Sequence, residues 1–215
     1  MKKQIAVFVL LLLITAGSFA QNLTKSFGGG FIFDYSGNNG VKGKESGITE
    51  FVGFRNTSYG GFIFFDMSFV ELGLNFSYGL LRIVDRVSDD TTKLTLSAEF
   101  GSALQLGFSV LGKYPTPLGG GAATLFPMFG VDYSRVIYAM DPDRNKISKA
   151  GDFSQFGLLA GMGLDLDFSR NIFLRTEALF HVRFPSKVIK DMSGYIYKTT
   201  LGMGPQIKVA MGGRF

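Results

Sequence analysis

His181 is the only histidine of the chain and the residue best suited to general acid–base chemistry. A nucleophilic mechanism would require a serine close to it, and the nearest downstream serine, Ser186, lies five residues further on. His181 also alternates with Arg175, Glu177 and Arg183, as residues on one face of a strand do. We therefore assign no catalytic residue and expect His181 to belong to a polar network.

Two other patterns resemble ligand-binding motifs but lack essential residues. Asp141, Asp143 and Asn145 have the alternate spacing of a calcium loop, but a lysine replaces the required glycine and an aspartate replaces the final glutamate. The glycines at 28–30 lie inside an alternating pattern and open no helix, unlike a phosphate-binding loop. The chain contains no cysteine. The sequence thus predicts no metal site and no cofactor.

The elements that position these side chains are predicted to be strands, because apolar and small or polar residues alternate through most of the chain. We expect eight strands, at residues 26–35, 57–66, 69–80, 93–111, 124–138, 153–165, 172–184 and 199–215. The segment 57–66 is apolar on both faces, so its register stays open. The segment 93–111 is about twice the length needed to cross a bilayer. It is either one strand that projects above the membrane or two strands with a kink near Gly101 and Ser102.

The first twenty residues predict a secretory signal peptide. Lys2 and Lys3 precede the apolar segment Ile5–Ile14, and small residues lead to Ala20. Ten apolar residues are too few to span about 30 Å of hydrocarbon as a helix. Residues 21–215 would then form one domain. Loss of the two lysines lowers the formal charge from +5 to +3, which is too small to suggest a nucleic-acid partner.

The polarity of the alternation favours an all-β membrane barrel, with the large apolar residues toward lipid and the other face toward the lumen. The inner face is rich in Gly, Ser and Ala, which suits the narrow interior of an eight-stranded barrel. It also carries charges of both signs, which can neutralise one another. We expect a lumen that is mostly small and charged, and therefore plugged or very narrow. Its expected polar network comprises Asp34, Glu71, Glu99, Asp132, Asp165, Arg175, Glu177, His181, Arg183, Lys208 and Arg214.

The predicted connections alternate in length, as in outer-membrane barrels with long outer loops and short periplasmic turns. Long or polar connections are expected at 36–56, 82–92, 139–152 and 185–198, and tight ones at 66–68 and 165–171. The Gly- and Pro-rich segment 112–123 is an exception, because it should be periplasmic yet is long.

The C-terminal segment Thr199–Phe215 alternates throughout and ends on an aromatic residue. Together with the turn at 165–170, this pattern resembles the small eight-stranded outer-membrane barrels of the OmpA-transmembrane, OmpX and OmpW type. The chain departs from that type at Gly213 and Ala210, where a bulky residue and a glycine are usual. It also lacks tryptophan, so the interfacial aromatic belts would rely on tyrosines. These are Tyr35, Tyr78, Tyr133 and Tyr138.

The resemblance implies an antiparallel up-and-down barrel in the outer membrane, a monomer in contact with outer-membrane lipids. It also implies recognition of Phe215 by the barrel-insertion machinery during assembly. Two roles remain open. One is a structural or surface-interaction protein whose exposed loops bind ligands, and the other is an OmpW-like passive conduit for small solutes. The small, charged lumen favours the first, and we expect no enzymatic activity.

Overall fold

The computed structural model describes residues 25–44, 49–89, 92–140, 154–184, 189–190 and 195–215. The predicted signal peptide and the segment that contains Asp141, Asp143 and Asn145 lie outside these ranges. No helix in the described part of the chain is long and apolar enough to span a membrane.

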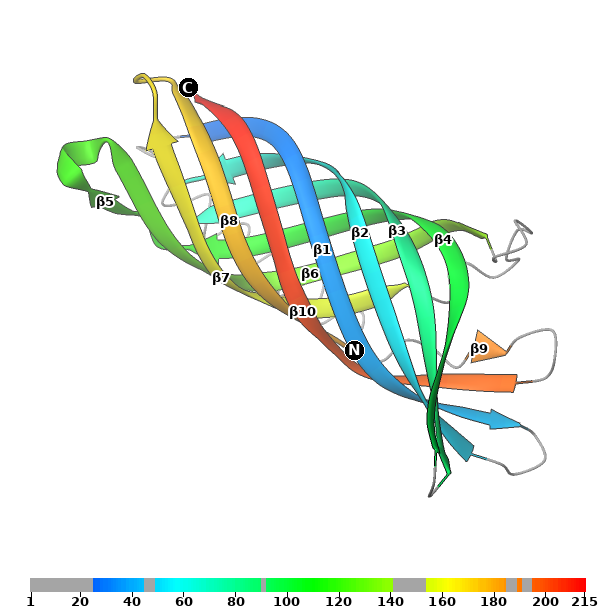
Figure 1. Cartoon of the computed structure of the whole chain (residues 1–215). Coiled ribbons are helices and arrows are strands. Elements are labelled where there is room, and N and C mark those ends of the chain that lie inside the picture. Colours follow the sequence, from blue (N-terminus) through cyan, green and yellow to red (C-terminus); the bar gives the residue numbers. More distant parts are fainter. Residues whose placement is uncertain (1–24, 45–48, 90–91, 141–153, 185–188, 191–194) are drawn as a thin grey trace, which may run out of the picture.

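The described chain folds almost entirely into strands (Figure 1). Those strands are β1 (Lys25–Lys44), β2 (Thr49–Met67), β3 (Val70–Asp89), β4 (Thr92–Lys113), β5 (Thr116–Leu118), β6 (Ala123–Met140), β7 (Gln155–Asp167), β8 (Ile172–Arg183), β9 (Ile189–Lys190) and β10 (Tyr195–Arg214). A short 3₁₀ turn, η2 (Gly119–Gly121), follows β5.

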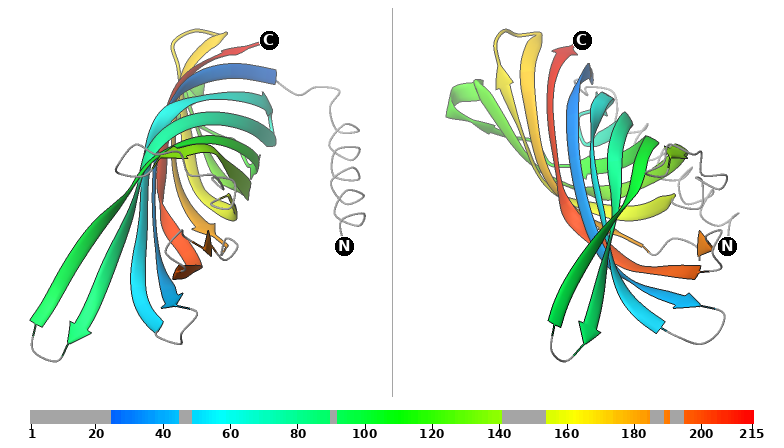
Figure 2. Two further views of the ribbon diagram at one scale, coloured as in Figure 1. Left: turned by 90° about the vertical axis from the view of Figure 1, so that its right-hand side faces the viewer. Right: turned by 45° about the vertical axis from the view of Figure 1, so that its right-hand side comes forward.

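Eight of these strands form a closed antiparallel barrel in the order β1-β2-β3-β4-β6-β7-β8-β10, and β10 pairs with β1 to complete the ring. The closing ladder runs from Ser26 opposite Arg214 to Lys44 opposite Tyr195. Consecutive long strands are neighbours throughout, and the two further views show their common tilt around the barrel (Figure 2). The predicted eight-stranded, up-and-down fold is confirmed.

Period-two alternation places one set of side chains inside the barrel and the other set outside. In β2, where the sequence left the register open, Phe62 and Phe64 point inward with 4% and 0% exposure. Tyr59 and Ile63 point outward with 61% and 46% exposure. Pairing with the neighbouring strands fixes this register. A shift by one residue would exchange the two faces of β2 and move Asp66 from the lumen to the outer wall.

The segment 93–111 belongs to one long strand, β4, and not to two. Its pairing with β3 shifts between Leu81 and Arg82, so that Leu81 faces Gly101 and Arg82 faces Glu99. Gly101 has a φ of 102°, which a residue with a side chain rarely adopts. The interruption near Gly101 is therefore a β-bulge that bends the strand without ending it. Beyond it, β3 and β4 extend as the longest hairpin of the barrel (Figure 2).

The strands extend further into the predicted long connections than the sequence indicated. Residues 36–44 and 49–56 belong to β1 and β2, and residues 82–89 belong to β3. The predicted loops at 36–56 and 82–92 are therefore wrong over most of their length. The pattern changes there because strands that leave the bilayer no longer need an apolar outer face, whereas backbone pairing continues. The short turns, at Ser68–Phe69 and 168–171, lie where they were expected.

The long Gly- and Pro-rich connection forms a small hairpin of its own. It lies at the end of the barrel with the short turns, called the turn end below; the opposite end is called the loop end. β5 pairs with the start of β6, from Thr116 opposite Leu125 to Leu118 opposite Ala123. Its tip consists of Gly119, Gly120 and Gly121, whose φ angles are 55°, 76° and 96°. Three successive residues in this region require glycine, so the tip sequence follows from the turn and not from phosphate binding.

Leu74 and Asn75 are adjacent in β3 but face opposite sides of the barrel wall, which provides a test of the polarity. Leu74 is 44% exposed on the outer wall. Leu74→Arg is expected to destabilise the barrel in bilayers by about 2–4 kcal/mol, the cost of a cation near the membrane midplane. Asn75→Arg should cost less, because the lumen has carboxylates that can pair with it. Urea unfolding in phospholipid vesicles would measure both, and equal losses would contradict the assigned faces.

Candidate functional site: the charged lumen

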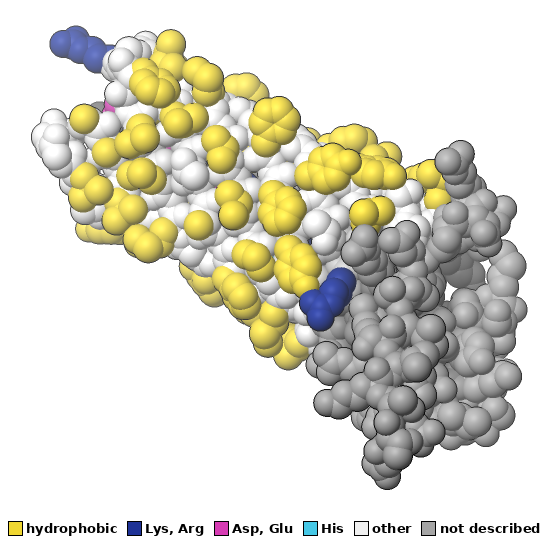
Figure 3. Space-filling model, in the orientation of Figure 1, with side chains coloured by type: hydrophobic (Ala, Val, Ile, Leu, Met, Phe, Trp, Pro, Cys, Tyr) yellow, Lys and Arg dark blue, Asp and Glu magenta, His cyan; other side chains and the backbone are white. Residues whose placement is uncertain are grey.

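The outer wall of the barrel carries large apolar side chains, and Figure 3 shows them on one face. Large exposed residues recur along every strand of the ring, for example Phe31 at 80%, Phe129 at 63% and Met211 at 58%. Among the side chains that the structure describes, the exposed charged residues are all cations: Lys25, Arg55, Arg135 and Arg170. None of the described Asp and Glu residues is exposed. Such a wall suits contact with hydrocarbon, bordered by anionic head groups.

The lumen contains most of the residues that the sequence assigned to a polar network. Ten of the eleven have described side chains, and nine of these are buried with exposures of 6% or less. They are Asp34, Glu71, Asp132, Asp165, Arg175, Glu177, His181, Arg183 and Lys208. Arg214 is partly buried at the turn end, with a side-chain exposure of 21%. The side chain of Glu99 lies outside the described part of the structure.

Arg175 of β8 is the centre of the charged cluster in the half of the lumen near the turns. Its Nε and Nη2 donate to the two oxygens of Asp165 at 2.7 and 2.8 Å. Nη1 donates to Glu71 Oε2 at 2.8 Å, and Nη2 also donates to Asp66 Oδ2 at 2.9 Å. Asp66 is also paired with Lys113 of β4. In the ring, β8 lies opposite β3 and β7 lies opposite β2, so these bonds tie facing walls together across the lumen.

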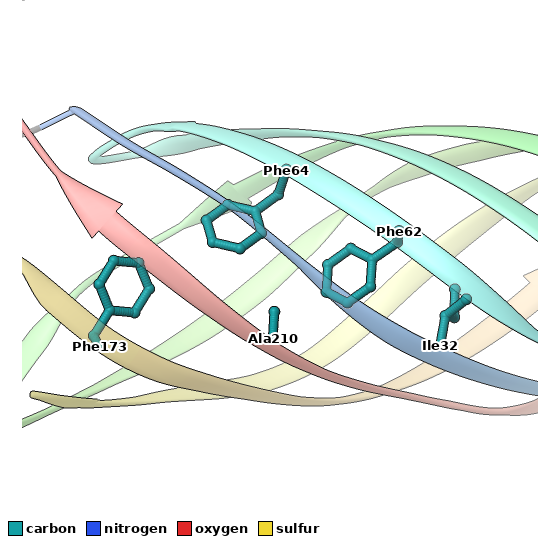
Figure 4. Packing of buried hydrophobic residues seen from close by; sticks show 5 residues of the cluster. All are labelled: Ile32, Phe62, Phe64, Phe173 and Ala210. Carbon is teal, nitrogen blue, oxygen red and sulfur yellow. The ribbon is translucent and has the colours of Figure 1, made fainter. Parts of the chain in front are cut away.

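Aromatic rings surround the same guanidinium. Its central carbon lies 4.4 Å from the ring centroid of Phe64, 5.0 Å from Phe126 and 5.1 Å from Phe173. All three rings are completely buried, and two of them are seen from close by in Figure 4. Because their faces attract a cation and exclude water, they strengthen the pairing of Arg175 with its carboxylates.

Lys208 of β10 occupies the next level of the lumen. Its Nζ lies 3.0 Å from Glu177 Oε2 and 3.9 Å from Glu71 Oε1, and 5.2 Å from the ring centroid of Phe62. Glu177 is completely buried, and Lys208 is only 2% exposed. Glu71 therefore faces two cations, Arg175 and Lys208, and links this level to the cluster around Arg175.

Arg183 of β8 is the centre of a second cluster toward the loop end. It binds Asp34 of β1 through Nη2, and its Nη2 lies 3.7 Å from Asp132 Oδ2 of β6. Its Nη1 donates to Ser36 Oγ at 3.4 Å. In the ring, β8 lies two positions from β1 and two positions from β6, and β1 and β6 lie opposite each other, so the upper lumen is also bridged from wall to wall.

His181 lies beside this second cluster, completely buried, with its Nδ1 3.2 Å from Asp34 Oδ1. Neither ring nitrogen has a hydrogen-bond partner in the described part of the chain. The carboxylate of Asp34 is already bound by Arg183, and the described hydrogen bonds include none from a serine to the imidazole. The geometry thus provides an imidazole in a charged cluster and no activated nucleophile.

The sequence missed two charged members of the lumen, Asp66 and Lys113. Both lie at strand ends, where the alternation could be read as the start of a turn. The alternation of inward and outward positions could have identified both. Asp66 lies on the inward face of its strand with Phe62 and Phe64, and Lys113 lies on that of its strand with Gln105 and Ser109.

The expectation of a mostly small and charged lumen was also incomplete, because large apolar residues point inward as well. Two buried apolar clusters lie in the lumen: Ile32, Phe62, Phe64, Phe173 and Ala210, seen in Figure 4, and Leu111, Phe126, Met128, Leu159 and Leu179. Three of these residues, Phe64, Phe126 and Phe173, are the rings that surround Arg175. The sequence pattern could not reveal them, because an apolar residue at an inward position cannot be distinguished from a break in the alternation of apolar and polar residues.

No group of three or more described acidic or histidine side chains is arranged to hold a metal ion. Several buried polar atoms, including Oγ of Ser58 and Oε1 of Gln206 on the two strands that pair with Asp34, have no hydrogen-bond partner within the described protein. Buried groups of this kind are normally satisfied by ordered water. The arrangement is therefore suited to holding the walls together and to retaining a little internal water.

A closed, eight-stranded antiparallel barrel with an apolar wall and a charged interior has the fold of the small outer-membrane β-barrel proteins. Among solved structures it is similar to the outer membrane protein OprG from Pseudomonas aeruginosa, with a TM-score of 0.62 and 14% sequence identity. That match covers 90% of this chain and 96% of OprG.

Weaker matches have TM-scores of 0.38 and 0.36. Neisserial surface protein A has 10% identity, over 87% of this chain and 99% of its own. Ail, the attachment invasion locus protein of Yersinia pestis, has 13% identity, over 91% of this chain and 100% of its own. No protein-family model matches the sequence, and no curated protein matches it. At these identities the similarity establishes the fold alone.

Proposed function

We propose that this protein is a sealed outer-membrane barrel with a structural or surface-interaction role, in which the charged lumen acts as a permanent plug. The observation that carries the proposal is the cluster around Arg175. One buried guanidinium binds a carboxylate of the neighbouring strand β7 and two carboxylates of the facing strands β2 and β3, and it is surrounded by three phenyl rings. A solute crossing this level would have to separate charges that are paired in a dry environment, which is costly.

The second cluster supports the same role, because a plug at two levels resists passage even when one of them fluctuates. Arg183 with Asp34 and Asp132 bridges the upper lumen, and Lys208 with Glu177 and Glu71 lies between the two. The long hairpins at the loop end then supply the surface for contact with other molecules. Residues 1–20 as a cleaved leader, Phe215 as the assembly signal and the monomeric state belong to this proposal.

Conductance in planar bilayers tests the plug. The refolded barrel, with insertion verified by its heat-modifiable migration in gels, is expected to give no stable and reproducible openings. The matched variant Arg183→Gln, which removes one bridging charge and keeps a similar polar length, should increase brief openings. Stable openings of the unmodified barrel whose size changes in Arg183→Gln would contradict the proposal and favour a conduit.

A second candidate, an OmpW-like conduit for small apolar solutes, draws support from the two apolar clusters in the lumen. These side chains are packed and buried, so such a path would require them to move apart. Uptake of a small apolar dye into vesicles separates the candidates: the plug predicts equal rates with and without the barrel. Uptake accelerated by the barrel and reduced by Leu159→Trp would favour the conduit.

A further inference from the structure

The outer wall near the turn end contains a hollow of about 250 Å³. Its rim is formed by Phe27, Ile63, Phe65, Leu72, Leu74 and Phe108, and its floor by the wall at Phe64 and Gly73. The rim residues come from four adjacent strands, β1 to β4, in two neighbouring rows of the sheet. The hollow is thus part of the rigid barrel wall and not of a loop.

Two neighbouring rows of outward-facing side chains border the hollow. Gly29 lies opposite Ile63, Ile63 lies opposite Leu74, and Leu74 lies opposite Phe108. One row therefore begins with Gly29, where Ile63 Cγ2 would lie 3.3 Å from an added Cβ, and the preceding row begins with Phe27, opposite Phe65. An elongated apolar ligand could lie between the two rows, in contact with carbon atoms on both sides.

A cation stands at the head of this hollow. Lys25 is the first residue of β1, is exposed, and shares the outward face with Phe27, about 7 Å away along the strand. Its carbonyl accepts a hydrogen bond from Phe215 N at 3.0 Å, which anchors its backbone. No ion pair joins its ammonium group to another residue in the described part of the chain.

The surroundings of Lys25 favour an anionic partner. The nearby carboxylates Asp66 and Glu71 point into the lumen, where Arg175 binds them. The hollow is continuous with the apolar wall that faces hydrocarbon, and Lys25 lies at the edge of this wall, next to the short turns. An acyl chain in the hollow would bring its own head group to this edge.

We propose that the hollow and Lys25 form a binding site for an anionic phospholipid of the leaflet at the turn end. One acyl chain lies between the two rows of side chains, and the phosphate group pairs with Lys25. The site requires the barrel to lie in a phospholipid leaflet, but it is independent of whether the lumen is sealed. Its failure would therefore leave the proposed plug untouched.

Native mass spectrometry of the mature barrel in detergent tests the site, with phosphatidylglycerol and phosphatidylethanolamine of identical acyl chains as probes. The unmodified barrel should bind one phosphatidylglycerol about fivefold more tightly than phosphatidylethanolamine, the ratio expected from one lysine near a charged surface. Lys25→Gln should abolish this preference. Arg170→Gln, which removes another exposed cation at the turn end, should leave it unchanged.

The hollow itself is tested by filling it. Ile63→Trp should reduce the binding of both lipids at least tenfold, whereas Ile207→Trp, on the outer wall of β10, should not. Leu74→Trp fills the same space from β3 if Ile63→Trp does not yield the folded, heat-modifiable species.

Three results would overturn the proposal. The first is equal affinity of the unmodified barrel for the two lipids, and the second is an equal effect of Lys25→Gln and Arg170→Gln on the lipid preference. The third is an equal effect of Ile63→Trp and Ile207→Trp on lipid binding. A dimer that dissociates in Ile63→Trp would assign the hollow to a second copy of the chain and would also overturn it.

Discussion

Arg175→Met is expected to lower the free energy of unfolding of the barrel by about 3–5 kcal/mol, the cost of removing one partner from a buried ionic cluster. The side chain is 1% exposed, so no solvent can replace the lost charge. The variant would leave Asp165, Glu71 and Asp66 close together, and the cations nearest to them would be Lys113, Arg214 and Lys208. Repulsion among three carboxylates that approach from facing walls would push those walls apart.

Arg175→Lys keeps the charge but cannot bind Asp165 with two nitrogens while also reaching Glu71 and Asp66. It should therefore recover only part of the lost stability. Arg170→Met, at an exposed position in the turn before β8, is the matched control and should change stability by less than about 0.5 kcal/mol. Urea unfolding in vesicles, followed by circular dichroism, measures all three. A loss below about 1 kcal/mol in Arg175→Met would show that the cluster does not hold the barrel together.

Gly30→Val is expected to prevent closure of the barrel. Gly30 lies in β1 on the inward face, opposite Ala210 of β10. A Cβ at this position would overlap the carbonyl oxygen of Val209 and would lie 2.5 Å from the Cα of Ala210. Both are backbone atoms of the closing ladder, so the strain cannot be relieved by a change of rotamer. The β1–β10 ladder would have to separate, which exposes unpaired backbone groups to lipid at several kcal/mol each.

Gly61→Val provides the control for this prediction. Gly61 lies on the outer face of β2, and the nearest atom to a Cβ built there is the carbonyl oxygen of Gly30, at an ordinary 3.8 Å. This variant should fold and migrate as a heat-modifiable species, whereas Gly30→Val should migrate as unfolded protein at all temperatures. A folded, fast-migrating Gly30→Val barrel would show that the closing strands are not as tightly packed as described.

The main features of the fold could be predicted from the sequence, because a membrane barrel has few alternatives. Backbone groups must be paired within the bilayer. In a strand with period-two alternation, such as 199–215, the apolar set of residues can point only toward lipid or toward the lumen. The same alternation identified most of the lumen charges, including Arg175, Glu177 and Lys208, since a charge is rarely tolerated on the lipid face. The strand ends were harder to predict, because outside the bilayer the apolar signal that marks a strand disappears while the hydrogen bonds continue.

The alternating sequence by itself predicted an eight-stranded barrel, the polarity of most of its strands and the inward position of most buried charges, because each of these follows from the period of a single strand. It left open the register of 57–66 and whether 93–111 is one strand or two. Only the tertiary structure decided which charges meet. Arg175 and Glu71 are 104 residues apart and come from opposite walls, so their contact depends on the register of every strand between them. The same registers place Phe64, Phe126 and Phe173 around that guanidinium and set Lys25 at the head of an apolar hollow. Such contacts arise between strands, and no pattern along one strand can contain them.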